Sequence, residues 1–111
     1  MSADAARTGT RAKRRLVKTG ADKQQPWLVV NNDRHPFADE QFIAVAVSRY
    51  RYESSIALSE EVRETGGVPE SSFVAPWSVH SPRIEDVTVW QGRMTETFVD
   101  RVVDEQQSYV R

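Results

Sequence analysis

Hydrophobic residues occur in short runs that are separated by clusters of turn-forming residues. Residues 27–31 are nearly continuous in apolar and β-branched side chains and end at an Asn-Asn-Asp turn signal, which predicts a buried strand. Residues 42–47 are apolar on both alternating faces, which predicts a central strand. Shorter extended segments are expected over 54–59, 72–75 and 87–90, with a single helical turn opening at Ser81-Pro82 and running to Asp86.

The last part of the chain has a different periodicity. After Thr95, a residue type that caps helix N-termini well, apolar side chains recur at helical spacing and alternate with charged ones. This pattern predicts an amphipathic helix that lies on a core. Several short strands followed by one helix favour a mainly β fold, a small, strongly curved antiparallel sheet or barrel with the helix covering it.

Length and charge divide the chain into an arm and one domain. A chain of 111 residues has room for a single core. Residues 1–23 carry seven basic and two acidic side chains, a net charge of +5, whereas residues 24–111 carry eight basic and 14 acidic ones, a net charge of −6. We expect residues 1–22 to be a basic, disordered N-terminal arm and residues 23–111 to form the folded domain.

Composition excludes several classes of site. The chain has no cysteine, which rules out a disulfide framework, a thiolate metal site and a cysteine nucleophile. The two histidines, His35 and His80, lack the spacing of metal ligands, so we expect both to be structural and predict neither a metal nor another cofactor. No apolar run is long enough to span a membrane or to serve as a signal peptide, and we expect a cytoplasmic protein.

One segment concentrates side chains that suit nucleic acid. Ser48-Arg49-Tyr50-Arg51-Tyr52 follows the second predicted strand and combines a hydroxyl, two guanidinium groups and two aromatic rings. Such a set can hold phosphate and stack unpaired bases. An edge-strand ladder in which the arginines only cover the tyrosines explains the same residues.

The order of these segments resembles the PemK/MazF family of toxin–antitoxin toxins. The likeness covers about residues 25–110, and its pieces are the 25–33 segment, the strand that ends in Ser48, Gly66-Gly67-Val68-Pro69, Gly92-Arg93-Met94 and the terminal helix. His35-Pro36-Phe37 and Pro76-Trp77-Ser78-Val79 match a divergent branch of that family.

The resemblance implies an SH3-like β-barrel, a homodimer and a metal-independent endoribonuclease that cuts single-stranded RNA at short motifs. It also implies a cognate antitoxin protein that occupies the RNA groove. Ser48 falls on the family's hydroxyl position, where it would donate a hydrogen bond to a phosphate oxygen. Lys23, Tyr50, Arg51 and Tyr52 are the expected RNA-binding residues.

Two departures from the family pattern matter. Gln25 stands where the family has its catalytic arginine, and glutamine offers a hydrogen bond without a positive charge. Arg49, next to Ser48, is the first candidate to supply that charge, and Lys23 is the second. The family's first strand is also not recognisable, so either the basic arm supplies a divergent strand or that strand is lost.

Three hypotheses follow from this comparison. The chain is an active ribonuclease toxin; or it is a catalytically impaired member that binds RNA, DNA or an antitoxin; or it is an interaction module whose barrel contacts a protein partner. If the parent chain cuts no RNA and the Gln25→Arg variant does, the second hypothesis is supported over the first.

Overall fold

The computed structural model describes residues 12–20, 24–32, 34, 40–67 and 71–110, and its elements are almost all strands. The strands are β1 (Arg15–Thr19), β2 (Gln25–Val29), β3 (Ala44–Ser48), β4 (Ile56–Leu58), β5 (Arg63–Thr65), β6 (Ser72–His80) and β7 (Val87–Met94). Two short 3-10 turns, η1 (Glu60–Val62) and η2 (Ile84–Asp86), and one C-terminal helix, α2 (Glu96–Gln107), complete the described elements.

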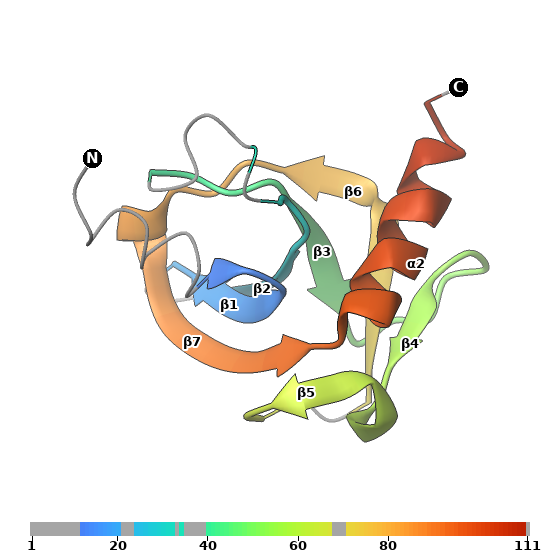
Figure 1. Ribbon diagram of the computed structural model, residues 1–111, viewed down its shortest axis with the longest axis horizontal. Coiled ribbons are helices and arrows are strands. Elements are labelled where there is room, and N and C mark those ends of the chain that lie inside the picture. The colour runs from blue at the N-terminus through green and yellow to red at the C-terminus, as the bar shows by residue number, and fades with distance from the viewer. Residues whose placement is uncertain (1–11, 21–23, 33, 35–39, 68–70, 111) are drawn as a thin grey trace.

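All seven strands belong to one antiparallel sheet with the order β4-β6-β3-β2-β1-β7-β5. Figure 1 shows the sheet curling into an open barrel, with the long β7 arching below β1 and β2 and α2 standing beside β6. The predicted fold class, a small antiparallel barrel with a C-terminal helix, is confirmed.

The main core fills the inside of this barrel. Because side chains alternate between the two faces of a strand, every second one points into the barrel. The helix α2 closes this core with Phe98, Val99 and Val102. The strand residues of this cluster are Leu16, Leu28, Val45, Val47, Ile56, Leu58, Val74 and Met94. Because six of the seven strands and α2 contribute to one apolar cluster, the sheet and the helix form a single hydrophobic unit.

A second, smaller core lies on the opposite face of β1 and β2. Val17 and Val29 are buried there with Ala12 and Phe42, and Phe42 meets the Trp90 ring edge-on at 6.1 Å between ring centroids. Both faces of the central strands are therefore covered, which explains why residues 27–31 and 42–47 are apolar on both faces.

The first strand corrects the expectation of a disordered arm over residues 1–22. Residues 15–19 form β1, which pairs with β2 on one side and β7 on the other. Leu16 and Val17 are fully buried, one in each core. Two adjacent apolar residues suffice for a strand here because its neighbours supply hydrogen bonds on both edges. The alternative that the basic segment supplies a divergent first strand is confirmed; residues 1–11 lie outside the described residues.

Strand β6 is longer than the predicted segment 72–75 and contains a bulge. Ala46 pairs with Ala75 and Val45 pairs with Val79, so three residues of β6, from Pro76 to Ser78, have no partner on β3. Proline is tolerated at such a bulge because its missing N–H is not needed for the ladder.

The terminal helix is confirmed, and two other elements differ from expectation. The Thr95 hydroxyl accepts a hydrogen bond from the Phe98 N–H at 3.2 Å, which is an N-cap. In the turn before β7, Arg83 and not Ser81 occupies the N-cap position, and its side chain makes no capping hydrogen bond. Strand β5 was not predicted; its side chains are exposed, so it has no alternating hydrophobic pattern.

Candidate functional site

The C-terminal end of β3 lies beside the N-terminal end of β2. Trp27 pairs with Ala46 and Leu28 with Val45 in an antiparallel register. Continuing this register by two residues places Gln25 across from Ser48, on the same face of the sheet. The structure therefore brings together two of the three predicted catalytic residues, which are 23 positions apart in the sequence.

Ser48 keeps a hydrogen-bond donor available. Its hydroxyl oxygen accepts the Tyr50 N–H at 3.0 Å, which fixes the side chain at the point where the strand ends. No donation by this hydroxyl occurs among the described residues. A half-buried hydroxyl held in this way can donate to an oxygen of a bound phosphate.

The amide of Gln25 is held by the main chain. Its Nε2 donates to the Pro26 carbonyl at 2.8 Å and to the Val47 carbonyl at 3.3 Å. Both amide hydrogens are engaged, and the remaining oxygen is an acceptor. In this arrangement Gln25 supplies neither a charge nor a free donor to an anion next to Ser48.

The residues after Ser48 are exposed on a turn and not on an extended strand. Arg49 and Arg51 are exposed, and Tyr50 is 74% exposed. The expected strand end that gathers both arginines and both tyrosines is thus replaced by a bend, since β3 stops at Ser48. Arg49 is close to Ser48 in sequence and accessible to a ligand, as its predicted role requires.

Tyr52 is held differently from Tyr50. Its N–H donates to the Ser55 hydroxyl at 3.0 Å, and that hydroxyl donates back to the Tyr52 carbonyl at 2.8 Å, which closes a tight turn. The Tyr52 ring meets Trp77 edge-on with centroids 5.8 Å apart, and Trp77 meets Tyr109 in the same way at 6.3 Å. We call Tyr52, Trp77 and Tyr109 the aromatic row.

The aromatic row was missed by the sequence analysis apart from Tyr52. An apolar sequence context such as that of Trp77 is typical of core or interface packing, yet this residue is 41% exposed and is not among the buried residues of either core. The bulge at 76–78 turns Trp77 outward, and Pro76 inside a strand is the signal that points to such an irregularity.

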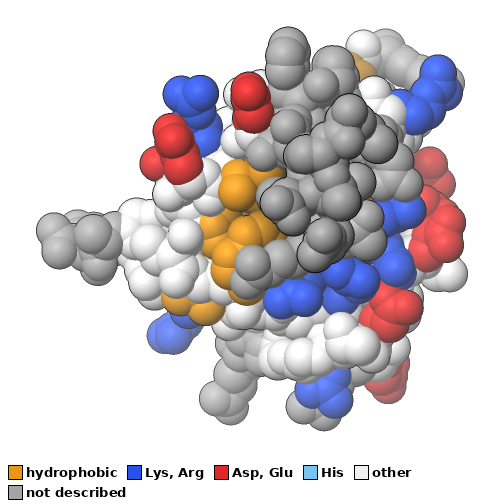
Figure 2. All heavy atoms as spheres, turned by 60° about the vertical axis from the view of Figure 1, so that its left-hand side comes forward, with side chains coloured by type: hydrophobic (Ala, Val, Ile, Leu, Met, Phe, Trp, Pro, Cys, Tyr) orange, Lys and Arg blue, Asp and Glu red, His pale blue; other side chains and the backbone are white. Residues whose placement is uncertain are grey.

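Basic side chains gather on a different part of the surface. Figure 2 shows lysine and arginine side chains in a band beside hydrophobic ones on the face that lies to the left in Figure 1. The register of β1 and β7 sets Arg15 directly opposite Arg93. Lys23, the remaining predicted RNA-binding residue, lies outside the described residues.

The part of the chain that the structure describes has neither a metal-binding cluster nor a membrane-spanning helix. It contains no group of three or more histidine, cysteine, aspartate or glutamate side chains that could hold a metal ion. None of its helices is long and apolar enough to cross a membrane.

Comparisons of sequence find no relatives, whereas comparison of structures does. No protein-family model and no curated protein matches the sequence. A solved structure described as an endoribonuclease in complex with its cognate antitoxin, from a mycobacterial species, superimposes with a TM-score of 0.69 at 14% identity, covering 88% of this chain and 92% of that one. A second, described as an endoribonuclease from a mycobacterial species, has a TM-score of 0.66 at 16% identity, covering 88% of each chain. The chain therefore has the fold of these mycobacterial endoribonucleases.

Proposed function

We propose that this chain is a toxin of the PemK/MazF type, an endoribonuclease that cuts single-stranded RNA at short motifs and is held inactive by a cognate antitoxin. The observation that carries the proposal is the hydrogen bond from Gln25 on β2 to the carbonyl of Val47, the residue before Ser48 on β3, in a fold shared with proteins described as endoribonucleases. In this proposal the chain acts as a homodimer in the cytoplasm, where its RNA substrate is found.

The reaction is a transesterification within the RNA. The 2′-hydroxyl oxygen attacks the adjacent phosphorus, and the bond from phosphorus to the 5′-oxygen breaks. The 2′-hydroxyl loses its proton to solvent or a nearby base, and the leaving 5′-oxygen gains one. The products are a 2′,3′-cyclic phosphate and a free 5′-hydroxyl. Because the nucleophile belongs to the substrate, no metal-activated water is required, and we propose a metal-independent enzyme.

Ser48 and Arg49 have separate roles in this proposal. The Ser48 hydroxyl donates to a non-bridging phosphate oxygen, where negative charge increases in the transition state. Arg49, exposed one residue beyond the strand, supplies the positive charge that Gln25 lacks. Lys23, Tyr50, Arg51 and Tyr52 contact the RNA on either side of the cleaved bond.

The test is incubation of the purified chain with a long single-stranded RNA in EDTA, followed by mapping of the cut sites and their termini. We expect discrete cuts with cyclic phosphate ends that disappear in Ser48→Ala. Thr97→Ala, which removes a hydroxyl from the exposed side of α2, is the matched control and should cut like the parent. Equal cutting by Ser48→Ala would remove Ser48 from the mechanism, and cutting only when a divalent metal is added would contradict metal independence.

A second candidate function is supported by the hydrogen bonds of Gln25. Gln25 is neutral, and both of its amide hydrogens are bonded to main-chain carbonyls. Its side chain therefore offers a bound phosphate neither a positive charge nor a free hydrogen-bond donor. The chain would then bind RNA or the antitoxin without cutting. Absence of cuts across a diverse RNA, from folded protein that still binds it, would favour this function over the first.

A further inference from the structure

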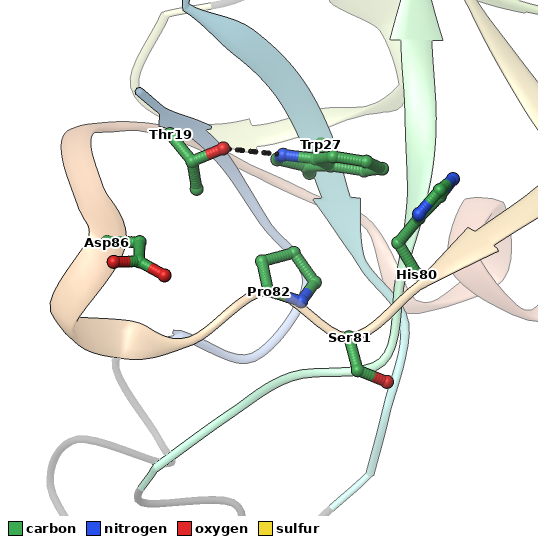
Figure 3. Close-up of a pocket in the computed structure, with 6 residues that line it drawn as sticks. All are labelled: Thr19, Trp27, His80, Ser81, Pro82 and Asp86. Carbon is green, nitrogen blue, oxygen red and sulfur yellow. Dashed lines mark hydrogen bonds between the residues drawn. The ribbon is translucent and has the colours of Figure 1, made fainter. Parts of the chain in front are cut away.

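A cavity of about 270 Å³ opens next to β2, on the same face of the sheet as Gln25. It is lined by Thr19, Trp27, His80, Ser81, Pro82 and Asp86, which come from β1, β2, β6 and the segment leading to β7. Figure 3 shows the Trp27 ring along one side, Asp86 and His80 at opposite ends and Pro82 between them. Sites for drug-sized ligands occupy roughly 300–1,000 Å³, so this cavity suits one small planar group.

The aromatic wall of the cavity is held in place. The Trp27 indole N–H donates to the Thr19 hydroxyl at 2.9 Å, and the His80 ring lies against Trp27 with centroids 4.8 Å apart. Holding an indole from two sides lowers the entropy cost of stacking a ligand on it. An unpaired nucleobase is the planar group that single-stranded RNA offers to such a wall.

The far end of the cavity carries a carboxylate. Asp86 is exposed in η2, and its side chain makes no hydrogen bond or ion pair within the part of the chain that the structure describes. Of the four RNA bases, guanine alone presents two adjacent donors, N1–H and N2–H₂, on its Watson–Crick edge, and both oxygens of a carboxylate can accept from them. A carboxylate repels phosphates and base acceptors, so it disfavours the other bases as well as attracting guanine.

The cavity is one nucleotide away from the proposed cleavage site. Thr19 pairs directly with Gln25, and Trp27 lies two residues beyond Gln25 on the same face, about 7 Å along the strand. A base bound against Trp27 would therefore belong to a nucleotide next to the phosphate at Ser48.

We propose that this cavity is a guanine-selective base pocket, in which an unpaired guanine stacks on Trp27, the His80 ring supports Trp27, and Asp86 accepts hydrogen bonds from the Watson–Crick edge of the base. The inference rests on the proposed function, because it names the base that the same RNA site selects.

The test is binding, so that it does not depend on cleavage. Four labelled uridine hexamers with one internal position varied as G, A, C or U, and 2′-O-methylated throughout to block cutting, are titrated with the chain in EDTA by fluorescence anisotropy. We expect the guanine RNA to bind about tenfold tighter than the other three. Asp86→Asn should reduce this preference to about threefold or less, since the amide replaces one acceptor with a donor.

Glu85→Gln is the matched control, because it removes a neighbouring charge in η2 outside this cavity and should keep the full preference. Thermal melting of both variants checks that they fold. Equal binding of all four RNAs by the parent, or an unchanged preference in Asp86→Asn, would overturn the base pocket and leave the proposed ribonuclease standing. If equimolar guanosine monophosphate displaces the guanine RNA, the pocket binds a free nucleotide, and the proposal that it binds a base of single-stranded RNA is overturned. If the parent chain cuts no RNA but still prefers the guanine RNA, the result contradicts the proposed ribonuclease activity and leaves the base pocket standing.

Discussion

The Gln25 amide reaches across from β2 to donate to the Val47 carbonyl, 3.3 Å away, one residue before Ser48. This contact ties the start of β2 to the end of β3 at the candidate site. It also means that the Gln25 side chain stabilises the sheet and keeps no free donor for a ligand. The position can therefore be changed to test what charge would contribute there.

Gln25→Arg is expected to raise cleavage of single-stranded RNA at least tenfold in kcat/KM, or to create cleavage where the parent has none. A guanidinium supplies a full positive charge and paired donors to the phosphate, and each tenfold corresponds to about 1.4 kcal/mol of transition-state stabilisation. The measurement is the initial rate on a fixed RNA in EDTA.

Gln24→Arg is the control for added charge alone. Gln24 is exposed and its amide donates to the Thr88 hydroxyl at 3.2 Å, away from Val47. If both variants accelerate cleavage equally, general attraction of RNA explains the gain and Gln25 has no special place.

Leu16→Ala is expected to lower the free energy of unfolding by about 2–5 kcal/mol, because Leu16 is fully buried in the main core and the truncation leaves a cavity. Urea denaturation followed by circular dichroism measures it. Lys18→Ala, in the same strand but only half-buried, should change the stability by less than about 1 kcal/mol. If Leu16→Ala lowers the free energy of unfolding no more than Lys18→Ala does, β1 does not contribute to the core in solution.

Gly92→Ala is expected to destabilise the fold by about 1–3 kcal/mol. A Cβ at Gly92 would overlap the Gly67 carbonyl oxygen and lie 2.6 Å from the Thr65 carbonyl oxygen, and both are main-chain atoms that cannot rotate away. It would also disturb the hydrogen bond from the Gly92 N–H to the Gly67 carbonyl at 2.9 Å. Thermal and urea unfolding of the variant and the parent give the difference.

Gly67→Ala is the matched control in the same contact. A Cβ at Gly67 meets nothing within 4 Å, so this variant should stay within about 1 kcal/mol of the parent. Equal losses for the two variants would show that the close approach of β5 and β7 is not what requires glycine at position 92.

Local patterns were sufficient where each residue's environment is determined by its near neighbours in the chain. The spacing after Thr95 predicted α2 and its cap, and the apolar runs predicted β2 and β3, because a helix face and a two-faced central strand leave periodic signals. β1 and β5 left no such signal. β1 has two apolar residues between basic ones, and β5 has exposed side chains, so both depend on the strands beside them.

The sequence by itself determined the class of fold, the terminal helix and the identity of Ser48 and Gln25 as the residues to examine. Tertiary structure alone decided that these two residues lie beside each other on adjacent strands, since their proximity depends on the register of strands separated by a long loop. It also decided the aromatic row and the cavity beside Trp27. The aromatic row forms because the bulge in β6 lies beside the end of α2. The cavity beside Trp27 forms where three strands and a turn meet. Contacts of this kind depend on chain closure over dozens of residues, and no local pattern encodes them.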